Sequence, residues 1–302
     1  MAKTLISVVG PTAIGKTKLA IALAKEYQTS IISADSRQFF KEMKIGTAVP
    51  SLEELSTIPH YFIQHKSILE LYSVGDFERD AIAIIEKLFQ NNEVIVMVGG
   101  SGLYIDAVAK GLDNFPEVNP EIRINLNHKL EKEGIIALQE ELKLTDPSYY
   151  KKVDSQNPHR LIRALEICIG TGKPYSSFLD KKKSKRPFEI ITVGVEADRE
   201  LIYDKINQRV DVMMNEGLLE EVKTLIPYKH LNALQTVGYK ELFMYFEDQC
   251  TLEFAISEIK KNTRRFAKRQ LTWFRKNDST IWMPHNATVP MILEKIKNNT
   301  NE

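Results

Sequence analysis

Residues 10–17 read Gly10-Pro11-Thr12-Ala13-Ile14-Gly15-Lys16-Thr17, the eight-residue pattern of a phosphate-binding P-loop. The apolar stretch Leu5–Val9 precedes this segment, and apolar residues at helical spacing follow it from residue 19. This arrangement predicts a strand, a turn and a helix. Backbone N–H groups of such a turn bind anionic oxygens, Lys16 adds a positive charge, and the Thr17 hydroxyl is placed to bind Mg²⁺. The segment therefore predicts a polyphosphate site, with a fortuitous glycine-rich turn as the alternative.

Further strands and helices alternate along the chain. Ser30–Ala34, Glu93–Val98 and Ile190–Val195 have the short apolar character of buried strands, and helical patterns separate them. Asp76 is expected to cap the N-terminus of one of these helices. Strands separated by helices form a parallel sheet with helices on its faces. From residue 119 to 186 helical patterns dominate. We therefore predict an α/β fold in which residues 1–118 and 187–302 form a P-loop core with a helical C-terminal part, and residues 119–186 form a helical insert domain.

Composition narrows the class of protein. The 302 residues are 43% hydrophobic and 27% charged, which is ordinary for a globular protein that buries a core. The two cysteines, Cys168 and Cys250, are too few for a zinc cluster or a disulfide framework, so we expect a cytoplasmic protein. No stretch approaches twenty apolar residues, so no membrane segment is expected. The formal net charge of +1 does not by itself indicate a polyanionic partner.

Asp35 follows the second predicted strand, where ligands of doubly wound sheets bind. A carboxylate there can accept a proton from a nucleophile, or it can simply cap the next turn. Gln38 carries an amide able to pair with an adenine edge. P-loop NTPases normally place an aspartate at the end of a second buried strand. Here the candidate strand Val94–Val98 is followed by Gly99-Gly100 instead. The pattern therefore disfavours an ATPase or a kinase.

A strongly basic stretch lies near the C-terminus. Between Ile259 and Lys276 there are eight basic residues and no acidic ones: Lys260, Lys261, Arg264, Arg265, Lys268, Arg269, Arg275 and Lys276. Several are spaced i,i+4, so like charges repel on one helix face. Phosphates of an RNA backbone or of a substrate would offset this repulsion. The alternative is a solvated face neutralised by acidic residues from elsewhere in the chain.

These segments together resemble the bacterial tRNA dimethylallyltransferases along most of the chain. Six separated motifs carry the resemblance: Gly10–Thr17, Asp35–Gln38, Gly99–Tyr104, Asn157–Glu166, Gly238–Glu241 and Ala267–Arg275. The last of them is the most distinctive.

The resemblance implies a specific reaction. In that family the P-loop, here Gly10–Thr17, holds the diphosphate of dimethylallyl diphosphate with Mg²⁺ nearby. The residue matching Asp35 acts as base toward the exocyclic N6 amine of an adenine beside the anticodon, and the residue matching Arg209 helps to hold the diphosphate. The resemblance thus implies a catalytic group of Lys16, Thr17, Asp35 and Arg209, with Thr17 at the metal.

The resemblance also implies a tRNA-facing surface. The insert is similar to the family's mobile domain, which closes over the anticodon stem-loop, and we expect the enzyme to act as a monomer. The residues expected to face tRNA are Asp35, Ser36, Arg37, Gln38, Ser101, Arg123, His159, Arg160, Leu161, Ile162, Arg163, Lys268, Arg269, Gln270, Leu271, Thr272, Trp273, Phe274 and Arg275.

Some positions depart from the family pattern. Ile14 stands where a small residue is usual and is expected to narrow the loop, His159 stands where Gln is common, and Ser101 replaces Thr but keeps the hydroxyl. Three other functions stay open at this point. They are dimethylallyl transfer to free AMP or ATP, a P-loop kinase of a small hydroxyl substrate with Asp35 as base, and a non-catalytic RNA-binding module. The long insert and the basic helix argue against a free nucleotide, which needs neither.

Overall fold

The computed structural model describes residues 3–179 and 185–300. It divides into two compact units, one formed by Met1–Lys110 with Arg186–Glu302 and the other by Gly111–Lys185. The second unit begins before residue 119, where the helical patterns begin. The reason is local packing, because Phe115 stacks on Tyr175 at 4.8 Å and Val118 packs where Gly170 has no side chain.

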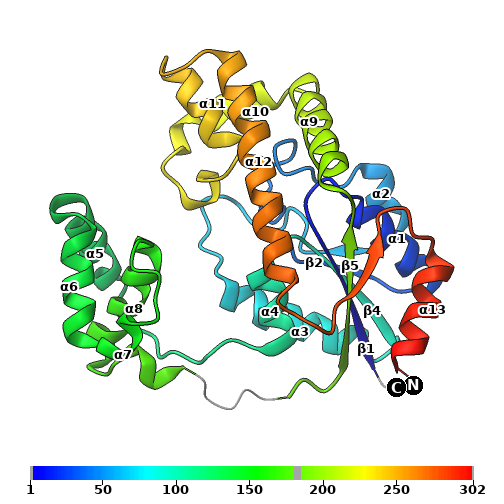
Figure 1. Ribbon diagram of the computed structural model, residues 1–302, viewed down its shortest axis with the longest axis horizontal. Coiled ribbons are helices and arrows are strands. Elements are labelled where there is room, and N and C mark those ends of the chain that lie inside the picture. Colours follow the sequence, from blue (N-terminus) through cyan, green and yellow to red (C-terminus); the bar gives the residue numbers. More distant parts are fainter. Residues whose placement is uncertain (1–2, 180–184, 301–302) are drawn as a thin grey trace. The chain divides into compact units, whose positions relative to one another are not determined.

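The larger unit contains a parallel sheet of six strands in the order β3-β2-β4-β1-β5-β6 (Figure 1). The strands are β1 Thr4–Val9, β2 Ile31–Ser33, β3 His60–Tyr61, β4 Val94–Val98, β5 Glu189–Glu196 and β6 Ile281–Pro284. In the centre, Leu5 of β1 is in register with Ile95 of β4 and Ile190 of β5. This sheet confirms the predicted α/β fold.

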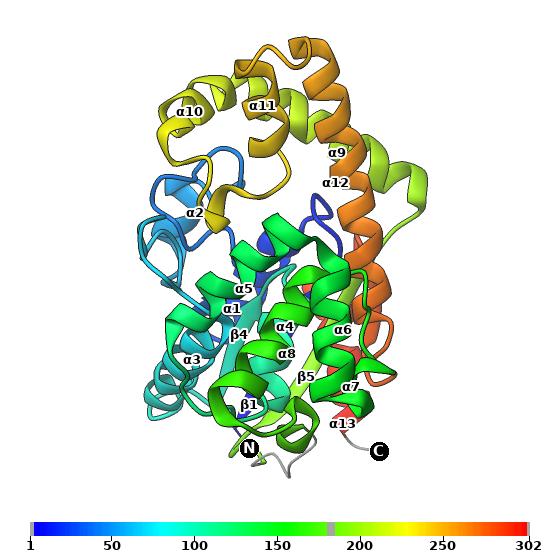
Figure 2. The same ribbon diagram turned by 90° about the vertical axis from the view of Figure 1, so that its left-hand side faces the viewer.

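Helices cover both faces of the sheet. The helices of the larger unit are α1 Lys16–Glu26, α2 Leu52–Thr57, α3 Val74–Leu88, α4 Gly102–Lys110, α9 Arg199–Asn215, α10 Leu218–Thr224, α11 Tyr239–Phe246, α12 Leu252–Phe274 and α13 Val289–Thr300. Both ribbon views show α9, α10 and α11 beyond the carboxyl ends of the strands, with the long α12 beside α9 (Figures 1 and 2). No helix in the described part of the chain is long and apolar enough to cross a membrane.

The central strands are buried on both faces, as parallel sheets require. Along β1, Leu5 and Val9 enter the core cluster that contains Phe77 of α3. Ile6 and Val8 enter a second cluster with α1, α9 and α13. Alternating side chains of one strand thus supply both cores.

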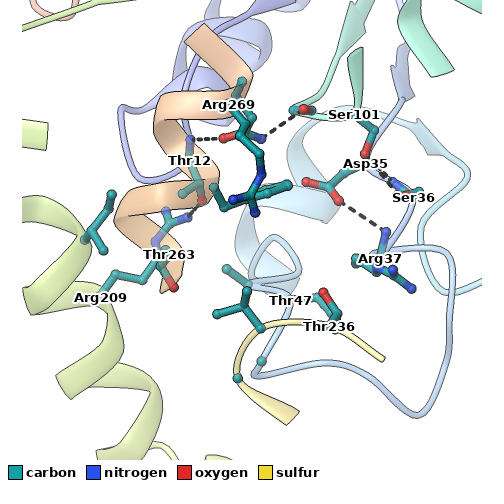
Figure 3. A pocket seen from close by; sticks show the side chains of 18 of the residues that line it. Thr12, Asp35, Ser36, Arg37, Thr47, Ser101, Arg209, Thr236, Thr263 and Arg269 are labelled. Atoms are coloured by element: carbon teal, nitrogen blue, oxygen red, sulfur yellow. Dashed lines mark hydrogen bonds between the residues drawn. The ribbon is translucent and has the colours of Figure 1, made fainter. Parts of the chain in front are cut away.

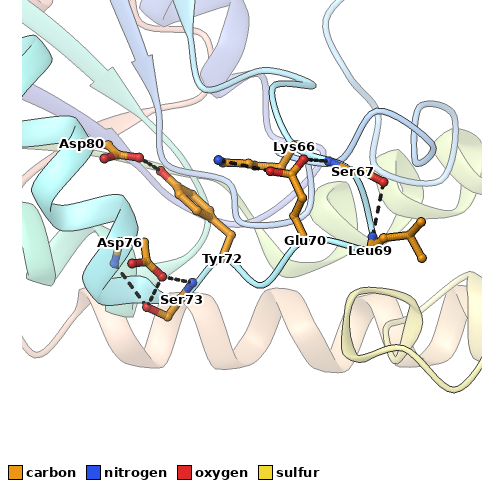
Figure 4. Close-up of polar contacts among 8 residues, drawn as sticks. All are labelled: Lys66, Ser67, Leu69, Glu70, Tyr72, Ser73, Asp76 and Asp80. Carbon is orange, nitrogen blue, oxygen red and sulfur yellow. Dashed lines mark hydrogen bonds and ion pairs between the residues drawn. The ribbon is translucent and has the colours of Figure 1, made fainter. Parts of the chain in front are cut away.

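The N-terminus of α3 corrects one prediction. Ser73, not Asp76, is the N-cap: its hydroxyl accepts the N–H of Asp76, and the Asp76 carboxylate accepts the N–H of Ser73 (Figure 4). This reciprocal capping box starts the helix before Asp76. Just before it, the Tyr72 hydroxyl donates to Asp80 at 2.9 Å, which ties the entering chain to the helix (Figure 4).

Among its described residues, the smaller unit contains helices joined by loops and no strand. It contains α5 Pro120–Glu133, α6 Ile135–Thr145, α7 Pro147–Tyr150, α8 Pro158–Thr171 and a final 3₁₀ turn, Tyr175–Phe178. Three of these helices begin with proline directly after an Asn or Asp cap, because proline suits the first helical position, where no N–H partner is needed. Leu126, Leu138, Leu142, Leu161 and Leu165 form its separate core.

Candidate active site

The P-loop turns sharply from β1 into α1. Gly10 and Gly15 have φ of 142° and 100°, and Ala13 also lies in the left-handed region at 65°. A Cβ on Gly10 would lie 2.6 Å from the carbonyl oxygen of Val195, so only glycine fits there. The prediction that Ile14 narrows the loop is wrong. Its side chain is 2% exposed and packs into the core below, which leaves the cradle open.

Lys16, Asp35 and Arg209 meet at a small cavity of about 70 Å³ beside the P-loop, which Thr17 also lines. The Lys16 ammonium donates to the carbonyl of Pro11 at 2.7 Å. Burial lowers the pKa of Lys16 to about 8, against the opposing attraction of Asp35 and with a further lowering by Arg209. Burial disfavours the charged form of a lysine, and a bound anion close to it favours that form. An anion in this cavity would therefore stabilise the positive charge of Lys16.

Asp35 occupies the turn after β2. Oδ1 accepts the N–H of Arg37 at 3.2 Å, so Asp35 does cap its turn. The carboxylate also projects into the space between Thr12, Ser101 and Arg37 (Figure 3). Burial raises the pKa of Asp35, although the bond from Arg37 and the charge of Lys16 oppose that rise. A carboxylate with a raised pKa is a stronger base, so capping and proton acceptance are compatible here.

A larger cavity of about 390 Å³ adjoins the first. The two share Thr12, Asp35 and Arg209, which therefore lie at their junction. Arg209, on α9, donates to the hydroxyl of Thr12 at 3.4 Å. Much of the larger cavity is apolar, with walls from Ile206, Val210, Met213, Leu218, Val237, Ile259 and Phe266. The site thus combines a cationic anion cradle with an apolar chamber, and a carboxylate stands between them.

The loop formed by residues 44–48, which lines both cavities, is fixed from two sides. The Glu221 carboxylate accepts the N–H groups of Lys44, Ile45 and Gly46 at 2.7–3.0 Å and the hydroxyl of the buried Tyr239 at 2.7 Å. Sequence reasoning missed Glu221. The nearest indication in the sequence was the Gly238–Glu241 motif, which contains its partner Tyr239 but to which no role was assigned.

Gln38 fixes the same loop from the other side. Its amide donates to the carbonyls of Thr47 and Ala48 at 3.2 and 2.9 Å. The amide hydrogens predicted to read an adenine are therefore engaged by backbone, which corrects that prediction. Near Asp35, the Ser101 hydroxyl accepts the N–H of Ser36 at 3.1 Å.

Arg37 anchors the wall opposite the P-loop. Its guanidinium donates to the carbonyls of Asn232 and Ala233 at 3.3 and 2.9 Å. Arg37 also lines the larger cavity, so it joins the Asp35 turn to the segment that precedes α11.

The basic helix α12 has two kinds of cation. Five of the basic residues between Ile259 and Lys276 have partners on other parts of the chain or on the preceding turn: Lys260 with Asp211, Lys261 with Glu258, Arg264 with Asn207, Arg265 with Asn262 and Arg275 with Glu196. Lys268 and Arg269 are exposed, and no carboxylate pairs with either among the described residues. Carboxylates thus neutralise only part of the basic stretch, in the way that the solvated-face interpretation expects, while Lys268 and Arg269 are available to an external anion.

Several residues expected to face tRNA are buried. Gln270 and Phe274 of α12 are each 5% exposed, and Leu271 packs against the second core cluster. Leu161 and Ile162 belong to the core of the helical unit. Their apolar side chains gain more from packing than from solvent, which corrects the prediction of RNA contact for them. Trp273 and Thr272 are exposed, and Trp273 lines the larger cavity while its indole N–H donates to Asp106 at 2.8 Å.

In the helical unit, Arg123 and Arg163 converge on Glu166. Arg123 donates through two nitrogens at 3.1 and 2.7 Å, and Arg163 donates at 3.0 Å. Burial would raise the pKa of Glu166, but these two guanidinium groups outweigh burial and lower it. Both arginines keep part of their surface in solvent, and His159 and Arg160 lie nearby in the first turn of α8.

Known proteins share this architecture. A family model described as IPP transferase matches residues 38–277. The chain is 61% identical to the tRNA dimethylallyltransferase of Christiangramia forsetii over 301 residues, which is the whole of both chains. It is 58% identical to that of Flavobacterium johnsoniae, covering 98% of this chain and 99% of the relative.

Solved structures agree. The tRNA isopentenylpyrophosphate transferase of Bacillus halodurans has a TM-score of 0.71 at 35% identity, covering 99% of this chain and 96% of that one. A eukaryotic dimethylallyltransferase, described as acting on tRNA, has a TM-score of 0.83 at 25% identity, covering 99% and 79%. The family predicted from the six motifs is confirmed: the chain belongs to the IPP transferase family.

Proposed function

We propose that this chain transfers the dimethylallyl group of dimethylallyl diphosphate to the exocyclic N6 amine of the adenine next to the anticodon of a tRNA. Its relatives, matched over their full length, are named tRNA dimethylallyltransferases. The observation that carries the proposal for this chain is the position of Asp35 and Arg209, at the junction of an anion cradle and an apolar chamber.

The donor fits this division of the site. Backbone N–H groups of the P-loop, Lys16 and Arg209 would bind the diphosphate, and the apolar walls would receive the five-carbon group. As the N6 lone pair forms a bond to the allylic carbon, the bond between that carbon and the diphosphate oxygen breaks. The diphosphate leaves with the electron pair. Cationic side chains fixed in place stabilise this developing charge without reorganisation.

Asp35 would take the proton. The adenine amine is a poor nucleophile because its lone pair is delocalised into the ring, so its N–H must be released as the new bond forms. Asp35 lies at the junction with its pKa raised, which suits a general base.

The chemistry of the donor set fits Mg²⁺. The Thr17 hydroxyl and the Asp35 carboxylate line the small cavity, and Mg²⁺ prefers oxygen ligands of this kind. We expect Thr17 to hold the ion, which when bound neutralises charge on the diphosphate.

An RNA acceptor is supported by Arg269, which is exposed and lines the larger cavity, and by the neighbouring exposed Lys268, because a free nucleotide would not require this pair of cations. We further propose that the helical unit closes over the anticodon stem-loop. Since one copy of the chain supplies both cavities, we expect a monomer to suffice, acting in the cytoplasm where tRNA is modified.

Acceptor competition tests the proposal. Radiolabelled dimethylallyl diphosphate is offered with Mg²⁺ to an anticodon stem-loop RNA, AMP and ATP together. We expect label only in the RNA. Label in AMP or ATP would favour the cytokinin-type reaction. Formation of ADP and a phosphorylated acceptor from ATP and a small hydroxyl compound would favour a kinase, although β4 is followed by Gly99-Gly100 and no aspartate stands there.

A further inference from the structure

One side chain joins three motifs that are far apart in the sequence. Gln270 of α12 accepts the N–H of Thr12, in the P-loop, through Oε1 at 2.9 Å. Its Nε2 donates to the carbonyl of Gly100, in the turn after β4, at 2.9 Å. The bond from the backbone N–H of Thr12 is drawn as a dashed line (Figure 3). Gln270 is 5% exposed, so these bonds are protected from water.

The position demands a glutamine for a chemical reason. A carboxamide offers an acceptor and a donor together, whereas an ionised carboxylate only accepts. The approach also demands a glycine at position 100, because a Cβ there would lie 2.2 Å from Nε2 of Gln270. The glycine-rich turn and the α12 motif therefore fit each other closely at this contact.

The contact changes how the P-loop works. N–H groups of a P-loop usually point at phosphates, but that of Thr12 is committed to Gln270. With the backbone of Thr12 held, its side chain lines both cavities, and its hydroxyl accepts the hydrogen bond from Arg209. The hydroxyl hydrogen of Thr12 then stays available for an oxygen of the leaving group.

We infer that Gln270 is a positioning residue: its two hydrogen bonds fix the positions of Thr12 and of the Gly100 turn relative to α12. The adjoining residues Lys268 and Arg269 are exposed on the same helix, so an RNA bound there is placed in register with the leaving-group site. This inference rests on the proposed function. It assigns Gln270 to alignment of donor and acceptor, not to RNA contact.

Kinetics of three variants test the inference. In Gln270→Met, we expect kcat for transfer to a stem-loop RNA to fall about 10- to 100-fold, because small misplacements in a reacting site cost about that much. The KM for RNA should stay within about twofold, since Lys268 and Arg269 are intact. Gly100→Ala should reproduce this loss by displacing the amide, and the double variant should lose little more, as expected of two changes to one contact. Gln90→Met, which replaces an exposed glutamine that follows α3 and lines neither cavity, is the control with wild-type rates.

Gln270→Glu supplies a readout that a merely structural role would not move. When ionised, the new carboxylate can accept from Thr12 but faces the carbonyl of Gly100 without a hydrogen to donate. When protonated, it can make both bonds. Its kcat relative to the wild type should therefore recover as pH falls. A constant ratio across the pH range would overturn the inference, as would wild-type kcat in Gln270→Met.

Hydrogen exchange keeps the test independent of catalysis. Amides of residues 10–17 should exchange faster in Gln270→Met than in the wild type, while those of α3 stay unchanged. Equal exchange in the P-loop would overturn the inference even in an active enzyme. A wild-type protein that transfers no label to RNA, yet shows the exchange difference, would refute the proposed function and leave the positioning role of Gln270 supported.

Discussion

Replacing Lys268 and Arg269 together by alanine should weaken RNA binding in a salt-dependent way. These two cations of α12 are exposed and have no carboxylate partner among the described residues. Arg269 also lines the larger cavity, so an RNA that reaches the site passes them. Each phosphate contact releases bound counterions, and the loss of a contact therefore flattens the dependence of affinity on salt.

The size of the effect follows from the number of contacts. Each contact contributes about 0.7 to 0.9 to the slope of log affinity against log salt, so two lost contacts lower the slope by about 1.4 to 1.8. Between 50 and 200 mM salt, the affinity gap between wild type and variant should shrink by roughly 7- to 12-fold.

Fluorescence anisotropy of a labelled anticodon stem-loop measures this slope. The matched control replaces Lys260 and Lys261 by alanine. It removes the same net charge from the same helix, but from cations already paired with Asp211 and Glu258. We expect the control to change the slope by less than half as much. Equal changes in both variants would show that net charge matters rather than contact, and an unchanged slope in the first variant would refute the assignment.

Four further predictions concern the cradle and its walls. Asp35→Ala should lower kcat about 10²- to 10⁴-fold, as loss of a general base does, with little change in the KM for dimethylallyl diphosphate in single-turnover assays; rescue by extra Mg²⁺ would instead indicate a metal role. Lys16→Ala should cripple turnover while stem-loop binding survives, and unchanged turnover would refute the diphosphate site. Because burial lowers the pKa of Lys16 to about 8, the cation is lost as pH rises, so kcat/KM for the donor should fall above about pH 8 in the wild type but not in Lys16→Arg. Glu221→Ala should lower the free energy of unfolding by roughly 2 to 4 kcal/mol in urea, since four donors lose their acceptor, whereas Lys223→Ala should have almost no effect.

The parts of the fold that sequence predicted are those encoded locally. A few consecutive residues suffice to predict the P-loop, from its glycine spacing, and the central strands, from their runs of apolar side chains. The edge strands β3 and β6 have two and four residues, too short for any period to emerge. They form because neighbouring strands offer N–H and C=O groups.

The site was harder to predict where its partners are distant in the sequence. Asp35 was identified from its place after a predicted strand and Arg209 from the family resemblance, and the structure brings them together. The roles of Gln38 and Gln270 were not identified from the sequence, because the hydrogen-bond partner of a side-chain amide cannot be inferred from the residues adjacent to it in the chain. For Gln270 those partners lie 258 and 170 residues away. The charges of α12 show the same limit, since Asp211 and Glu196, which pair with two of them, belong to other elements.

The most direct test of the central claim uses purified protein, unmodified tRNA, Mg²⁺ and dimethylallyl diphosphate labelled in its carbon chain. After the reaction one portion of the tRNA is digested to nucleosides and another to oligonucleotides that report the position, and both are analysed by mass spectrometry. We predict one labelled nucleoside, adenosine carrying a dimethylallyl group on N6, derived from the position next to the anticodon and formed in step with release of diphosphate. Label on another nucleoside, or diphosphate release with no label in RNA, would contradict the proposed reaction.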